Sequence, residues 1–167
     1  MVQAPPPSEK VPMTEPVPSF AVPRAAAVLG GLGLLPFVGI SLALWLLPLH
    51  YVGMLHAALI GYGLAIASFM GGVQWGLGIK ADLDGAGQWR VLGQSVVPAL
   101  VAWIGVLGPF PWQYPALMVA FLLVVWVDLR LARQGVAPTW YPLLRVPLTA
   151  GVLVCLVGAM AHALLLR

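Results

Sequence analysis

Polar side chains inside the apolar runs of this sequence are the first candidates for chemistry. Gln74 stands in the stretch SFMGGVQWGLGIK, residues 68–80, and Gln94 and Ser95 stand in a later run. A buried amide has donor hydrogens and an acceptor oxygen to satisfy, so it can line a solute path, hold a ligand or bond to a neighbouring helix. We expect Gln74 to bond across to a neighbouring helix, with Gln94 and Ser95 as its partners.

Asp128 is the acidic residue beside the fourth apolar run, and arginines follow it closely in the sequence. A carboxylate in a membrane protein can relay protons, but a relay needs further acids at membrane depth, and the apolar runs contain none. We therefore expect Asp128 to form an interfacial ion pair with one of three arginines, Arg90, Arg130 or Arg145.

Histidine and methionine residues gather near the other ends of these runs. His50, His56 and His162 should share one face of the membrane, with Met54 and Met160 at similar depth. Imidazole and thioether groups suit copper(I) or a haem iron. The methionine and histidine of each close pair are two positions apart, however, and on a helix such residues diverge by about 200°. We therefore expect no metal site, but interfacial histidines and lipid-facing methionines.

The familiar catalytic signatures are missing from the sequence. It contains no phosphate-binding glycine loop, no CxxC pair and no nucleophile elbow, and Cys155 is its single cysteine. Ser68 has no base close to it in the sequence. We expect a protein that is not an enzyme and that needs no cofactor.

The composition indicates which solvent surrounds the elements that hold these residues. Of the 167 residues, 61% are hydrophobic and 8% are charged, whereas a soluble domain carries about 25% charged residues. A surface with so few charges is solvated by lipid. The net charge is +3, and because the basic residues flank apolar runs, we expect them to meet anionic lipid headgroups and not nucleic acid.

The apolar runs predict an all-α fold, an integral membrane bundle of five transmembrane helices. A helix needs about 20 apolar residues to cross a bilayer. Residues 1–23 carry seven prolines and little apolar periodicity, which predicts a disordered cytoplasmic tail. The transmembrane domain then covers residues 24–167, with spans at about 25–47, 53–79, 91–107, 115–134 and 145–166.

The second span carries small residues three or four positions apart, a spacing that places them on one face of a helix. A face without large side chains lets two helix backbones come close, which is a main source of helix association in lipid. We therefore expect the second span to be the hub of the bundle and this face to contact the other helices. The face comprises Ala57, Gly61, Ala65, Ser68, Gly72 and Gly76.

Basic residues are distributed unequally between the two sides of this bundle. Arg167 alone falls on one side, and seven residues fall on the other: Lys10, Arg24, Lys80, Arg90, Arg130, Arg133 and Arg145. Lysine and arginine accumulate on the cytoplasmic side of membrane proteins. The asymmetry predicts a cytoplasmic N-terminus and a C-terminus outside.

Three stretches of the sequence resemble a family of small five-span membrane proteins, domain of unknown function 3429, which has a mitochondrial transmembrane protein among its members. The stretches are SFMGGVQWG at 68–76, GLGLLPF at 31–37, and the run from Asp128 through PTWYPLLRVPLT at 138–149. The resemblance covers residues from about 23 to 166. It implies a bacterial or mitochondrial inner membrane and no particular reaction, and we expect a multi-pass protein of the bacterial inner (plasma) membrane.

The sequence is consistent with two classes of function. The first is a non-enzymatic scaffold, accessory subunit or assembly factor, which the small-residue face and the lack of deep charge favour. The second is a small-solute or ion transporter or channel, formed by a homo-oligomer with polar faces such as those of Gln74 and Gln94. The partners we expect are the lipid bilayer and either other membrane-protein subunits or a second copy of the chain.

Overall fold

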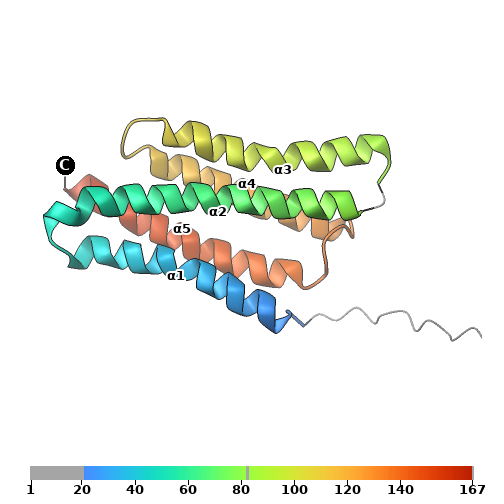
Figure 1. Ribbon diagram of the computed structural model, residues 1–167, viewed down its shortest axis with the longest axis horizontal. Helices are drawn as coiled ribbons and strands as arrows, with labels where there is room; N and C mark the ends of the chain where they lie inside the picture. The colour runs from blue at the N-terminus through green and yellow to red at the C-terminus, as the bar shows by residue number, and fades with distance from the viewer. Residues whose placement is uncertain (1–20, 82, 167) are drawn as a thin grey trace, which may run out of the picture.

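The computed structural model describes residues 21–81 and 83–166, and these residues form five long α-helices (Figure 1). The helices are α1 (Arg24–Leu46), α2 (Val52–Lys80), α3 (Gly85–Val106), α4 (Gln113–Arg133) and α5 (Tyr141–Leu165), with a short 3-10 turn, η1 (Leu49–Tyr51), before α2. Each of the five is long and apolar enough to cross a membrane. The predicted all-α, five-span fold is therefore confirmed. Most of the predicted tail, residues 1–20, lies outside the described residues.

The helices lie in two layers, with α1, α2 and α3 in front of α5 and α4 (Figure 1). α2 occupies the middle of the front layer and contacts α1, α3 and α4, and α5 packs against α1 and α4. Successive helices run in opposite directions, so the start of α1, the end of α2 and the start of α5 lie at the same end of the bundle. We call it the Lys80 end, after the last residue of α2.

Two helices begin earlier than the sequence predicts. α3 begins at Gly85 rather than at residue 91, because Asp84 caps it: the Oδ1 atom of Asp84 accepts a hydrogen bond of 2.7 Å from the backbone N–H of Gly87. α5 begins at Tyr141 rather than at residue 145, with Pro142 in its first turn, where proline is tolerated. Arg145 therefore lies about one turn inside α5.

Aromatic rings fill the centre of the bundle. Phe37 of α1 is completely buried, and its ring makes edge-to-face contacts with Tyr62 of α2 and Phe121 of α4, at centroid distances of 5.0 Å and 5.8 Å. The hydroxyl of Tyr62 also donates a 2.9 Å hydrogen bond to the carbonyl of Gly33, which ties α2 to α1. These contacts join three helices at mid-depth.

The first half of α1 lies away from α2. α1 contains Pro36, and in Figure 1 the distance between the two helices grows toward the Lys80 end. A proline inside a helix removes one backbone hydrogen bond and bends the helix. The bend directs the first half of α1 away from α2, and a groove lined by residues of α1, α2 and α5 lies there.

The face of α2 that packs against the bundle differs from the predicted one. All the residues of the predicted face are exposed, and a Cβ atom added at Gly61, Gly72 or Gly76 would have no atom of the described residues within 4 Å. The expectation that this face contacts the other helices of the chain is therefore wrong. We call it the α2 outer face; it comprises Ala57, Gly61, Ala65, Ser68, Gly72 and Gly76.

The buried face of α2 uses a neighbouring set of small residues, Gly63, Ala67, Gly71 and Gly78. At Gly71 the backbones of α2 and α3 come so close that an added Cβ would lie 2.5 Å from the carbonyl oxygen of Ser95. The close approach that the sequence predicts for α2 is therefore present, but on the side that also carries Gln74.

Adjacent glycines of α2 should respond differently to the same substitution. Gly71→Ala places a methyl group against the α3 backbone, and we expect it to destabilise the fold by about 1–3 kcal/mol, the usual cost of overpacking. Gly72→Ala places the same group in open space and should be neutral or slightly stabilising, because alanine favours helix. Melting temperatures and monodisperse yields in mild detergent test this. Equal effects of the two variants would contradict the packing described.

Candidate functional site

A buried ion pair lies between α4 and α5 near the Lys80 end. The Nε atom of Arg145 donates to Oδ2 of Asp128 at 2.7 Å, and the two side chains are 10% and 1% exposed. The sequence predicts Asp128 at the interface, paired with Arg90, Arg130 or Arg145. Arg145 is the partner, and the pair is buried between the helices. The interfacial depth of the pair stays a prediction. The early start of α5 places Arg145 on the helix face that meets α4.

Gln74 joins α2 to this pair. Its Nε2 group donates to Oδ1 of Asp128 at 2.8 Å and to the backbone carbonyl of Val124 at 3.0 Å. Gln74 is completely buried, and within the described part of the chain its Oε1 atom accepts no hydrogen bond. The amide therefore bonds across to a neighbouring helix, as expected, but that helix is α4 and not α3.

Tyr141 completes the group. Its side chain interacts with the carboxylate of Asp128, and its ring lies 5.7 Å from the guanidinium carbon of Arg145, a cation–π distance. We call Gln74, Asp128, Arg145 and Tyr141 the polar cluster. One carboxylate thus receives donors from α2 and from α5, and it is itself held by α4.

The predicted partners of Gln74 lie elsewhere. The hydroxyl of Ser95 donates to the carbonyl of Leu92 in its own helix at 2.7 Å, and Gln94 is half-buried. The other candidate arginines are also separate from Asp128: Arg90 is exposed, and Arg130 lies over the ring of Trp126 at 5.6 Å. The expected group of Gln74, Gln94 and Ser95 is therefore wrong, and so is an ion pair of Asp128 with Arg90 or Arg130.

Two of the three histidines meet at the opposite end of the bundle. The Nδ1 atom of His162 lies 3.3 Å from Nε2 of His56, and Nδ1 of His56 is hydrogen-bonded to the hydroxyl of Tyr114. Both histidines are buried between the helices, and their position at the membrane interface stays a prediction.

The other members of the predicted outer cluster do not join them. His50 is exposed on η1, Met54 is 63% exposed, and Met160 packs against the core instead of facing lipid. In the part of the chain that the structure describes, no group of three or more histidine, cysteine or acidic side chains is placed to hold a metal ion.

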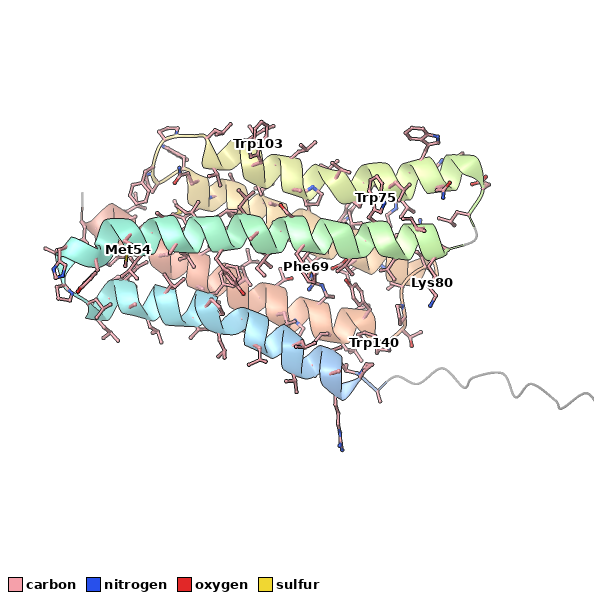
Figure 2. The ribbon with its side chains drawn as sticks, viewed as in Figure 1. Met54, Phe69, Trp75, Lys80, Trp103 and Trp140 are labelled. Atoms are coloured by element: carbon pink, nitrogen blue, oxygen red, sulfur yellow. The ribbon has the colours of Figure 1, made fainter. Side chains whose placement is uncertain are left out.

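A groove of about 290 Å³ adjoins the polar cluster between α1, α2 and α5. Its walls are mostly apolar, and its polar side chains are those of α5 and of Trp140 just before it. Figure 2 shows Phe69, one of the lining residues, on the side of α2 that faces α1, and Trp140 at the start of α5. The space is the one that the bend in α1 leaves open.

The three sequence stretches that resemble the family converge on this groove. The stretch at 31–37 contributes Gly33, the stretch at 68–76 contributes Phe69, and the run that ends at 149 contributes Trp140, Arg145 and Thr149. The stretch at 68–76 and the run from Asp128 also supply the polar cluster. Segments that are far apart in the chain therefore build one region, and we take the groove and the polar cluster together as the candidate functional site.

Five apolar helices that enclose a buried ion pair define an integral membrane protein. The chain belongs to the family described as protein of unknown function (DUF3429), whose model matches residues 22–161. It is 33% identical over 141 residues to transmembrane protein 69 of Xenopus tropicalis, an alignment that covers 84% of this chain and 55% of the relative. The chain thus spans about half the length of this relative. No solved structure matches the chain.

Some members of the candidate site, and the partner of His56, could not be predicted from the sequence. Tyr141 and Trp140 resemble ordinary interfacial anchors there, and nothing marks Tyr114 as a partner of His56. A signal for the buried face of α2 does exist. Gln74 must face the bundle interior because lipid cannot satisfy an amide, and Gly71, Ala67 and Gly78 lie three, seven and four positions from it.

Removing one charge of the buried pair should cost more than removing both. Asp128→Asn and Arg145→Gln each leave a buried charged or polar partner unmatched, and we expect each to destabilise the fold by about 3–5 kcal/mol. The double variant should be more stable than the sum of these effects implies. Melting temperatures of the wild type, the two single variants and the double variant in detergent complete this double-mutant cycle. Arg90 is exposed, so Arg90→Gln serves as the control and should change the free energy of unfolding by no more than about 0.5 kcal/mol. Additive effects would contradict the pairing.

Gln74→Met should have a smaller effect than either charge change. The substitution removes the hydrogen bonds to Asp128 and Val124, but it also removes the Oε1 atom that has no donor among the described residues. An interhelical hydrogen bond in a membrane is worth about 0.6 kcal/mol on average and at most ~1.7 kcal/mol, so we expect a loss in that range. A loss as large as that of Asp128→Asn, measured by the same thermal melts, would show that Gln74 carries more than these bonds.

Proposed function

We propose that this protein is a non-enzymatic scaffold, accessory subunit or assembly factor of the bacterial inner membrane. In this proposal the α2 outer face binds a transmembrane helix of another subunit. The observation that carries it is the position of this face: it lies on the longest helix, it consists of small residues, and every one of them is exposed while the opposite face packs against the bundle.

Helix propensity supports a partner for this face. A helix surface that meets only lipid has no need of glycine, which costs up to ~1 kcal/mol per residue relative to alanine in a helix. Gly61, Gly72 and Gly76 all stand on the outer face with open space above them. A second helix can approach such a surface backbone to backbone, and the packing gained offsets that cost.

The polar cluster supports a role other than catalysis. The carboxylate of Asp128 is occupied by Gln74 and Arg145, which are themselves buried. A carboxylate whose two oxygens are already held by buried side chains is poorly placed to act as a catalytic acid or base.

The proposed orientation in the inner membrane is based on the basic residues. Every described lysine and arginine lies at or near the Lys80 end, which we assign to the cytoplasmic side.

Bulky substitutions on the outer face should separate the complex without unfolding the chain. Among the described residues no atom lies within 4 Å of a Cβ added at Gly72 or Gly76, so we expect Gly72→Leu and Gly76→Leu to keep wild-type melting temperatures. In affinity purification from the native membrane in mild detergent, a stoichiometric partner should be retained by the wild type and lost from both variants. Gly39→Leu, equally exposed and open but on α1, is the control and should retain the partner.

Other outcomes of this purification would change the proposal. If the retained partner is a second copy of the chain, the outer face is a homo-oligomer contact. If such an oligomer also conducts ions or a small solute in liposomes, the transporter alternative replaces the scaffold. A partner that Gly72→Leu and Gly76→Leu retain as firmly as Gly39→Leu does would contradict the use of the outer face.

A further inference from the structure

The groove beside the polar cluster has an amphipathic lining. Deep in the bundle it is lined by apolar groups such as Phe37 and Phe121, and toward the Lys80 end it is lined by Trp140, Arg145 and Thr149. Leu29 and Phe69, which also line it, are 69% and 63% exposed, so its rim reaches the lipid-facing surface of the molecule. A cavity with apolar walls and a few polar groups at one end is typical of a ligand site.

The salt bridge to Asp128 does not use all the N–H donors of Arg145 at the polar end of the groove. Its Nε atom is used by Asp128, but the two Nη groups have no hydrogen-bond partner among residues 21–81 and 83–166. Arg145 is also one of the residues that line the groove. A guanidinium presents five N–H donors in a fixed plane, and the outer pair suits the oxygens of a phosphate. The salt bridge and the Tyr141 ring hold this group in place.

The depth of Arg145 matches that of a lipid headgroup. Arg145 is four residues after the first residue of α5, which is about 6 Å along the helix axis. The headgroup and interfacial region of a bilayer occupies roughly 5–8 Å on each side of the hydrocarbon core. A basic pocket between transmembrane helices at this depth is the kind of site that binds anionic lipid headgroups.

We propose that the groove binds one membrane phospholipid, whose phosphate accepts hydrogen bonds from the Nη groups of Arg145 and whose acyl chain lies between α1 and α2. The basic residues around the Lys80 end, among them Arg24 at the start of α1, add a positive field that favours an anionic lipid. A phospholipid accounts for both parts of the lining, because it brings an acceptor head and an apolar chain together. It also reaches the groove sideways from the bilayer, through the rim at Phe69.

Two glycines of α1 provide a matched test. Gly33 lines the groove, and a Cβ added there meets no atom within 4 Å in the part of the chain that the structure describes. Gly33→Leu therefore fills the acyl part of the groove without a clash at Cβ. Gly31 is equally open, but it is exposed and is not one of the lining residues, so Gly31→Leu is the control. The delipidated chain in mild detergent is mixed with phosphatidylglycerol, and native mass spectrometry counts the lipids that stay bound.

We expect wild type and Gly31→Leu to retain one phosphatidylglycerol per chain, and Gly33→Leu to bind it about tenfold more weakly, a loss of ~1.4 kcal/mol. Equal retention by the three proteins means annular lipid only and overturns the proposal, as does a wild type that binds none. A second probe, diacylglycerol with the same acyl chains, lacks the phosphate and is tested on the wild type alone. The wild type should bind diacylglycerol at least about tenfold more weakly than it binds phosphatidylglycerol. Equal binding of the two lipids to wild type overturns the phosphate contact with Arg145, even if Gly33→Leu fails to fold.

Discussion

The buried contact between Asp128 and Arg145 constrains the whole bundle. Neither charge can remain unpaired while it is buried between the helices without a cost of several kcal/mol, so α4 and α5 must keep the two side chains together. Gln74 adds α2 to the same carboxylate. One carboxylate therefore fixes the rotation and the register of three helices. The apolar contacts could not do this alone, because lipid solvates apolar faces as well as a neighbouring helix does.

Because lipid solvates apolar helix faces, the sequence predicts the helices better than it predicts which face of each helix packs against the others. Five helices and their approximate ends follow from apolar length and from turn residues, and the structure has all five. The sequence predicts much less well which face of each helix is buried in the bundle. Small residues stand on two sides of α2, and the side with Gly72 and Gly76 looks as suitable for packing as the side with Gly71 and Gly78. In water, a polar outer face would have distinguished them; in a membrane only Gln74 does.

The relative positions of the helices are the second feature that the sequence does not predict. The choice of Arg145 over Arg90 and Arg130 depends on where α5 begins, and turn chemistry around Trp140 and Pro142 decides that start. The groove depends on a bend near Pro36, and the sequence indicates the bend but not its direction. The meeting of His56 and His162 likewise depends on where the start of α2 and the end of α5 lie relative to each other. The stretches that resemble the family nevertheless mark the region correctly, since all three reach the groove.

The distance between Asp128 and Arg145 in a bilayer tests the central claim most directly. Solid-state NMR of the chain in liposomes, with isotope labels on the aspartate carboxyl carbon and the arginine Nε, reports this distance through dipolar coupling, and the signal that disappears in Asp128→Asn is that of Asp128. The account predicts strong coupling of Asp128 to one arginine Nε, as a nitrogen–oxygen contact of 2.7 Å requires, and its loss in Arg145→Gln but not in Arg90→Gln. An Asp128 signal without such coupling, or with coupling that survives Arg145→Gln, would contradict it.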